Sequence, residues 1–231
     1  MDNIELMKHY PDKYFDLAVV DPPYGININH SMGRRKGEKK SDYKKADWDK
    51  QPPPLEYFYE LFRVSKNQIV WGANHFISRI PYDSSCWIIW DKVNGETDFA
   101  DCEMAWASFN TAVRKFTFMW SGMMQGSSAN GGILEGNIRK REKRIHPTQK
   151  PIKLYDYCFS RFAKQGMKIL DTHLGSGSSR ISAYKAGLDF TACELDTEYF
   201  NDQEARFKEF VLKYAPADIE PMTKQGQTKL F

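Results

Sequence analysis

Short apolar runs alternate with longer amphipathic segments along most of the chain. The apolar runs are typical of buried strands, and the amphipathic segments have the apolar spacing of helices. We expect strands at Phe15–Val20, Gln68–Trp71, Cys86–Trp90, Met104–Ser108, Met167–Leu170 and Phe190–Glu194. We expect helices at Pro54–Val64, Ile152–Phe162, Ser178–Ala186 and Thr197–Tyr214. This alternation predicts an α/β fold in which helices cover both faces of a doubly wound parallel sheet.

The length and the turn-rich segments predict one domain with a tail. A chain of 231 residues suits a single α/β domain, which we expect to span residues 1–215. Residues 216–231 follow the last predicted helix and are expected to form a flexible C-terminal tail. The Gly- and Ser-rich stretch Ser121–Lys140 lacks periodicity and predicts a loop.

The positive charge is concentrated in two segments. The net charge is only +3, but Gly33–Lys45 and Arg139–Arg144 together carry +9, so the rest of the chain is at −6. Each basic run alone is most simply a solvated loop. Two such runs in one small domain favour a polyanionic partner.

The four cysteines are widely spaced, with no C-x-x-C pair, and predict reduced core thiols without a metal site. No apolar run is long enough to span a membrane, and the first ten residues lack the pattern of a secretion signal. We therefore expect a cytoplasmic protein that does not associate with a membrane.

A carboxylate and two prolines end the first predicted strand. Proline offers no N–H to a sheet and keeps the preceding residue extended, so the chain leaves the sheet at Asp21 in a stiff turn. A simple strand-ending turn is one interpretation. The aromatic Tyr24 within the DPPYG segment makes a functional loop the alternative.

A second candidate site lies in KILDTHLGSGSS, residues 168–179. Its strand ends on Asp171, and Gly175 and Gly177 precede a helix whose first N–H groups are free to bind a ligand. The next strand ends on Glu194, where an acid accepts hydrogen bonds from ribose hydroxyls in nucleotide-binding folds. Since no Lys-Ser/Thr pair follows the glycines, the segment is not a P-loop.

Three motifs, in their order along the chain, resemble the β group of DNA amino-methyltransferases. They are DPPYG at Asp21–Gly25, HPTQKP at His146–Pro151 and the GSGS turn after Asp171. In this family the catalytic motif precedes the cofactor motif, which is a circularly permuted order. This chain has Thr172-His173 where the family usually has Pro-Phe, and no large target-recognition domain fits between the motifs.

The resemblance implies a Rossmann-like methyltransferase sheet with S-adenosylmethionine as the methyl donor. It implies that the Asp21 carboxylate and the Pro22 carbonyl accept the N–H bonds of a base amine, while Tyr24 stacks on a base flipped out of the duplex. The implied catalytic residues are Asp21, Pro22, Pro23 and Tyr24. The implied cofactor-binding residues are Asp2, Asp21, His146, Thr148, Lys150, Asp171, Gly175, Ser176, Gly177 and Glu194.

The activity expected from the resemblance is site-specific methylation of adenine N6 in double-stranded DNA, as in restriction–modification systems. Methylation of cytosine N4 is the nearest alternative, although Asp21 in the first motif favours adenine. An RNA methyltransferase and a DNA-binding homologue without turnover are further alternatives. Methylation of cytosine carbon 5 is excluded, because that chemistry uses a cysteine that usually follows a proline, and no cysteine here does.

The expected partner is double-stranded DNA, in the cytoplasm of a bacterial or phage-infected cell. We expect DNA contacts in two loops, residues 31–50 and 121–145. The candidate phosphate-binding residues are Arg34, Arg35, Lys36, Lys39, Lys40, Arg139, Lys140, Arg141, Lys143 and Arg144. The chain end, with Gln227, Leu230 and Phe231, resembles the peptide by which bacterial proteins bind the sliding clamp; folding back onto the domain is the alternative. A homodimer is a further expectation.

Overall fold

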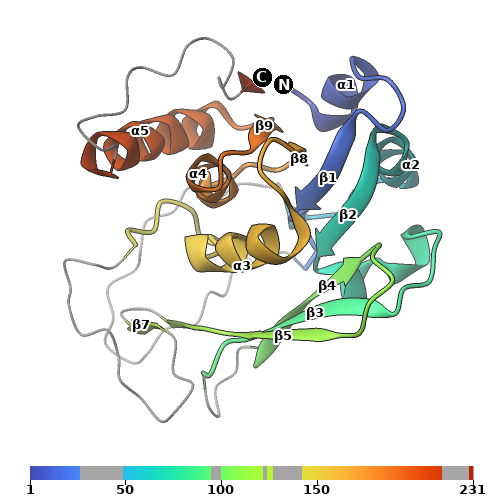
Figure 1. Cartoon of the computed structure of the whole chain (residues 1–231), viewed down its shortest axis with the longest axis horizontal. Coiled ribbons are helices and arrows are strands. Elements are labelled where there is room, and N and C mark those ends of the chain that lie inside the picture. Colours follow the sequence, from blue (N-terminus) through green and yellow to red (C-terminus); the bar gives the residue numbers. More distant parts are fainter. Residues whose placement is uncertain (27–48, 95–99, 122–123, 127–141, 215–228, 231) are drawn as a thin grey trace.

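The computed structural model describes residues 1–26, 49–94, 100–121, 124–126, 142–214 and 229–230. It contains an eight-stranded sheet in the order β10-β9-β8-β1-β2-β4-β3-β5, and a two-stranded sheet of β6 and β7 (Figure 1). The strands are β1 (Phe15–Val20), β2 (Ser65–Trp71), β3 (Cys86–Asp91), β4 (Cys102–Ala107), β5 (Arg114–Thr117), β6 (Met119–Ser121), β7 (Met124–Gly126), β8 (Lys168–Asp171), β9 (Asp189–Ala192) and β10 (Lys229–Leu230). The helices are α1 (Asn3–Lys8), α2 (Leu55–Val64), η3 (Ala73–His75), η4 (Ile77–Arg79), α3 (Ile152–Phe162), α4 (Ser178–Lys185) and α5 (Thr197–Tyr214).

Every predicted element is present, and β1, α3 and α5 begin and end at the predicted residues. The sequence did not predict α1, the two 3-10 helices, or strands β5, β6, β7 and β10. These elements are too short to show a helical or strand period. The expectation of a loop throughout Ser121–Lys140 is wrong at its start, where β6 ends and β7 forms.

The sheet is mixed, whereas the alternation of strands and helices predicted a parallel one. Strand β4 runs antiparallel to both β2 and β3. Strands β3 and β4 follow each other along the chain, and the Lys92 N–H donates to the Asp101 carbonyl at 3.0 Å between them. A parallel pair needs a crossover of about a dozen residues or more, so this shorter connection produces an antiparallel pair.

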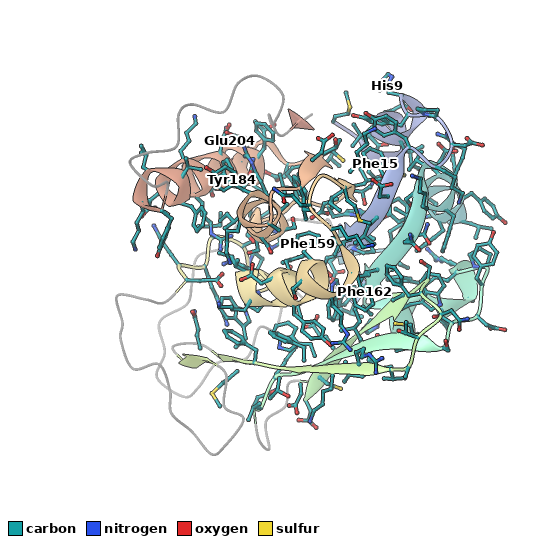
Figure 2. All side chains as sticks on the ribbon, viewed as in Figure 1. His9, Phe15, Phe159, Phe162, Tyr184 and Glu204 are labelled. Carbon is teal, nitrogen blue, oxygen red and sulfur yellow. The ribbon has the colours of Figure 1, made fainter. Side chains whose placement is uncertain are left out.

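Helices cover both faces of the sheet, as predicted, because β1 is buried on both sides. Leu17 and Val19 pack into one apolar cluster with residues of α3 and α4. Ala18 and Val20 point the other way, into a cluster with residues of α1 and α2. Figure 2 labels Phe159, which belongs to the α3 side.

The two candidate motifs lie at one edge of the sheet. Strands β1 and β8 pair in parallel, with Leu17 opposite Ile169 and Ala18 opposite Leu170, although 152 positions separate Leu17 from Ile169 in numbering. Their carboxyl ends therefore lie side by side, where ligands bind in doubly wound sheets. No helix within the described ranges is long and apolar enough to cross a membrane.

Candidate active site

The DPPYG turn is held by a residue outside the motif. Asp21 directly follows β1, and Pro22 is buried behind it. Asp49 is 2% exposed, and its Oδ1 accepts the backbone N–H of Tyr24 at 2.8 Å and that of Gly25 at 2.9 Å. Two hydrogen bonds to one buried carboxylate fix the backbone that presents the tyrosine.

The Tyr24 ring is stacked on His75, with the ring centroids 4.9 Å apart and the planes 15° from parallel. The chain reaches His75 through Gly72, which has a φ of +68°. A Cβ on Gly72 would lie 2.0 Å from Cε1 of Tyr24. Glycine is therefore required at this position both for the backbone conformation and for the position of the ring.

Both oxygens of Asp21 accept hydrogen bonds. Tyr24 Oη donates to Oδ1 at 2.9 Å, and Lys150 Nζ donates to Oδ2 at 2.5 Å. Burial raises the pKa of Asp21 above its ordinary value of 3.8, and the positive charge of Lys150 offsets part of this effect. The resemblance placed Lys150 among the cofactor-binding residues, whereas in this structure its ammonium group binds Asp21.

The rest of the HPTQKP segment packs toward the start of α5. The His146 ring lies 4.3 Å from the Tyr199 ring, and its Nδ1 accepts the Thr148 backbone N–H at 3.3 Å. Burial lowers the pKa of His146 to about 4, so the imidazole is neutral near pH 7. The segment thus contacts Asp21 after β1 through Lys150 and the start of α5, the helix after β9, through His146.

Asp171 is 1% exposed at the end of β8. Its Oδ1 accepts the His173 N–H at 3.0 Å, and its Oδ2 accepts the Ser179 hydroxyl at 2.5 Å. Burial raises the pKa of Asp171 to about 7. The carboxyl group ties the turn after β8 to the first turn of α4.

The turn after β8 places an acidic side chain beside an open glycine. Gly175 donates its N–H to Glu194 Oε2 at 2.8 Å, and Asp196 donates to Oε1 at 3.0 Å, which fixes the carboxylate at the end of β9. A Cβ on Gly175 would meet only the His173 carbonyl oxygen, at 3.9 Å, so space is open over this glycine. An acidic acceptor beside an open glycine turn fits the ribose and methionine portions of this cofactor.

The start of α4 is held by α5. Gly177 precedes α4 with a φ of +72°, and the Ser176 and Ser178 hydroxyls are 3.1 Å apart. Arg206 donates to the Ser176 carbonyl at 2.7 Å and pairs with Glu142 at 3.0 Å. The turn that contains the predicted cofactor residues Ser176 and Gly177 is therefore held in place by Arg206 of α5.

The Thr172-His173 departure from the family pattern forms a buried network. Tyr57 Oη and Thr172 Oγ1 are 2.7 Å apart, and Thr172 Oγ1 and His173 Nδ1 are 2.9 Å apart. His173 Nε2 lies 3.0 Å from the side-chain amide of Asn3. Asp2 caps the same helix, α1, by accepting the N–H groups of residues 4 and 5. The network links α1 to the cofactor turn.

Most of the predicted DNA-binding residues lie outside the described residues. These are Arg34, Arg35, Lys36, Lys39, Lys40, Arg139, Lys140 and Arg141. Lys143 is exposed, and the Arg144 guanidinium lies 4.6 Å from the centroid of the Trp120 ring and donates to the Trp120 carbonyl at 3.0 Å. Among the described residues, no group of three His, Cys, Asp or Glu is placed to hold a metal ion.

Sequence reasoning missed four side chains of the site: Asp49, His75, Lys92 and Glu103. Glu103 lies on β4, and its Oε2 is 3.1 Å from Lys150 Nζ, while Lys92 binds its Oε1 at 2.6 Å. Asp49 lies at the end of a loop expected to contact DNA, and the sequence assigned no role in the site to any of the four residues. Nothing in their spacing points to Asp21, because strand pairing and turn packing bring them there.

Comparison with known proteins decides the family. Residues 90–205 match the family model described as DNA methylase, which groups N6 and N4 methyltransferases. The chain belongs to this DNA methylase family. The amino-methyltransferase family predicted from the three motifs is thereby confirmed. Family membership also supports the expected methyl donor.

Individual relatives span most of the chain. It is 29% identical to Type II methyltransferase M.HinfI of Haemophilus influenzae, over 95% of this chain and 69% of the relative. M1.HpyAVI in complex with SAM shares 21% identity, covers 89% of this chain and 96% of its own, and has a TM-score of 0.53. The cytosine-N4-specific PvuII DNA methyltransferase, at 12% identity over 100% and 92% of the two chains, also has a TM-score of 0.53. These structures show the same Rossmann-like methyltransferase fold.

Proposed function

We propose that this DNA methylase is site-specific and methylates N6 of adenine in double-stranded DNA, with S-adenosylmethionine as the methyl donor. The observation that carries the proposal is the Asp21 carboxylate, which follows β1 at the edge where the Gly175 turn follows β8. A hydrogen-bond acceptor for an amine and a cradle for a nucleotide-type cofactor thus share one edge of the sheet. Similarity to M.HinfI supports a restriction–modification type of enzyme.

The reaction requires hydrogen-bond acceptors for the base amine and no nucleophilic side chain of the enzyme. The lone pair of an adenine amine is delocalised into the ring, so the amine attacks only if the charge that develops on nitrogen is stabilised. Asp21 and the Pro22 carbonyl would accept its two N–H bonds and stabilise that charge. The N6–carbon bond would form as the sulfur–carbon bond of the donor breaks, with S-adenosylhomocysteine leaving as a neutral thioether, and the proton lost from the nitrogen would pass to Asp21 and on to solvent. When bound, S-adenosylmethionine supplies a methyl carbon activated by a positively charged sulfur.

The remaining residues would bind the cofactor and orient the flipped base. Gly175 and Asp171 would hold the methionine portion of the cofactor, and Glu194 its ribose hydroxyls. Tyr24 would stack on the flipped base, exchanging its present partner His75 for the base. The Tyr24 backbone stays fixed by Asp49 during this exchange, so only the ring has to rotate.

Methylation of cytosine N4 is the second candidate. The fold likeness to the cytosine-N4-specific PvuII enzyme favours it, and the same acceptor pair suits both amines. The carboxylate at position 21 supports adenine, because in the resembling group aspartate at this position leans toward adenine and serine toward cytosine.

We further propose two kinds of contact outside the active site. The basic loops, residues 31–50 and 121–145, would bind phosphates of the duplex, and Lys143 is an exposed member of the second loop. The chain end would bind a sliding clamp through Gln227, Leu230 and Phe231. In the structure Lys229–Leu230 pairs with β9, which agrees with the alternative in which the end folds back.

The test is direct identification of the methylated nucleoside. The full-length protein is incubated with labelled S-adenosylmethionine and either duplex DNA, single-stranded DNA or RNA, and the products are digested to nucleosides. Labelled N6-methyladenine from the duplex supports the proposal, and N4-methylcytosine supports the second candidate. No transfer to any of the three substrates contradicts both, and transfer to RNA alone contradicts the DNA assignment.

A further inference from the structure

Glu103 is a charged side chain at the site to which neither the motifs nor the proposed function gives a role. It projects from β4, and 21% of its side-chain surface is exposed. Its Oε1 pairs with Lys92 Nζ at 2.6 Å. Its Oε2 shares two hydrogen-bond donors with the carboxylate of the active-site residue Asp21.

The sharing follows from four distances. Tyr24 Oη lies 2.9 Å from Asp21 Oδ1 and 3.2 Å from Glu103 Oε2. Lys150 Nζ lies 2.5 Å from Asp21 Oδ2 and 3.1 Å from Glu103 Oε2. Each donor that covers Asp21 is therefore within reach of one and the same oxygen of Glu103.

This arrangement matters because the Tyr24 hydroxyl and the Lys150 ammonium occupy acceptor positions on both oxygens of Asp21 and compete there with the N–H groups of a base amine. A donor that leaves a carboxylate in a part-buried site needs another acceptor; otherwise it bears a desolvation penalty. We propose that Glu103 is a positioning residue that receives the Tyr24 hydroxyl and the Lys150 ammonium, so that Asp21 is free for the amine. The inference rests on the proposed function, whichever base amine is the substrate.

The charges suit such an exchange. Burial by itself raises the pKa of Glu103, but Lys150 and Lys92 outweigh it, and the pKa falls to about 2. Glu103 is therefore a charged acceptor near neutral pH. Lys92 and Lys150 balance the charges of Asp21 and Glu103. The cluster is therefore neutral whether the donors lie on Asp21 or on Glu103.

The first experiment separates the rate from binding. Glu103→Gln keeps the size of the side chain and removes its charge, and the matched control is Glu60→Gln, whose carboxylate pairs with Arg63 on α2 at 2.7 Å. We expect kcat of Glu103→Gln to fall at least about tenfold while Kd for cofactor and duplex stays within about twofold, because only the reacting state is affected. The control should keep its activity. An unchanged kcat, or a loss confined to Kd, overturns the inference.

The second experiment uses the pH dependence of kcat/KM, whose acid limb reports Asp21. The charged and titratable groups that face Asp21 are Tyr24, Tyr57, Glu103, Lys150, Tyr155 and Asp171. Glu103→Gln removes a negative neighbour and should move the acid limb to lower pH, whereas Lys150→Met removes a positive neighbour and should move it to higher pH. A purely structural role would lower activity without these opposite shifts, so limbs that stay fixed or move together overturn the inference.

Two further measurements make the result decisive. If Glu103→Gln does not fold, Glu103→Asp keeps the charge but withdraws the carboxylate; it should lose rate with the acid limb unmoved, and full activity overturns the inference. Wild-type protein that methylates no base overturns the proposed function and this inference together. Wild-type protein that methylates a base, with Glu103→Gln equally active, overturns this inference alone.

Discussion

Asp21 follows β1 at the point where the chain turns away from the sheet, and its carboxylate carries the proposed chemistry together with the Pro22 carbonyl. In the structure the two oxygens of Asp21 accept from Tyr24 and Lys150, two side chains that the sequence assigned to the base and the cofactor. Burial raises the pKa of this carboxylate, and the neighbouring Lys150 and Tyr24 donors offset part of the rise. The proposed role of Asp21 in methyl transfer can be tested separately from cofactor binding.

Asp21→Ala should abolish methyl transfer and leave the affinity for the cofactor nearly intact, because the carboxylate faces the amine. Titration calorimetry with S-adenosylmethionine and an activity assay on the same preparation check both halves. Retention of even roughly a tenth of the normal rate would contradict the role, since loss of a preorganised electrostatic contact typically costs 100-fold or more.

Asp171 gives a prediction about stability. Its pKa is raised from 3.8 to about 7, so between these values the folded protein holds a proton that the unfolded chain has lost. The contribution of Asp171 to the free energy of unfolding therefore decreases as pH rises through this window, by at most about 1.4 kcal/mol per pH unit. Asp171→Asn removes the effect, so wild-type protein should lose stability relative to the variant between about pH 4 and pH 7. Denaturant unfolding of both proteins across this range measures the difference, and parallel curves would refute it.

At the scale of elements, the turn that follows β2 decides where Tyr24 lies. It passes through Gly72 into η3, and the Gly72 N–H donates to the Met104 carbonyl of β4 at 2.9 Å. The turn is thereby fixed to the neighbouring strand. A side chain on Gly72 would displace the ring of Tyr24 rather than the backbone.

Gly72→Ala should lower both stability and methyl transfer, and Gly166→Ala is the matched control. Gly166 has a φ of +79°, and a Cβ at this position would have nothing within 4 Å, so its substitution costs only backbone strain, roughly 1–2 kcal/mol. Gly72→Ala adds the clash with Tyr24 to similar strain. Unfolding free energies and single-turnover rates of the two variants should differ clearly, and equal behaviour would show that Tyr24 is free to move aside.

At the scale of the whole molecule, the uneven charge gives a prediction about DNA binding. Replacing Arg139, Lys140 and Arg141 with alanine should flatten the dependence of duplex affinity on salt, by about one unit of log–log slope for each phosphate that the variant no longer binds. The control replaces Lys66, Lys164 and Lys168, which lie near the amino ends of β2 and β8, at the opposite edge of the sheet from Asp21. It changes the net charge equally, so the same slope in both variants would exclude a specific role for the loop.

The chain end makes a second prediction at this scale. A peptide of residues 223–231 should bind a bacterial sliding clamp weakly, and the double change Leu230→Ala, Phe231→Ala should remove this binding without lowering methylation of a short duplex. Pairing of Lys229–Leu230 with β9 would compete with the clamp for the same residues. No binding by the unaltered peptide would favour the folded-back alternative.

The sequence by itself determined the elements and the two motif positions. Apolar runs and amphipathic spacing predict β1, α3 and α5 to the residue, because burial of one face or both imposes that period locally. The doubly wound topology also predicts that Asp21 and Asp171 share an edge, since parallel strands end on the same side.

Only the tertiary structure decided what surrounds Asp21. Glu103 reaches it because β4 inserts antiparallel between β2 and β3, and Asp49 reaches the DPPYG turn from the end of a segment expected to contact DNA. Lys150 lies on Asp21 because a loop distant in sequence folds across the sheet edge. Such contacts leave no period in the sequence, since they depend on which strands pair and not on the residues of any one strand.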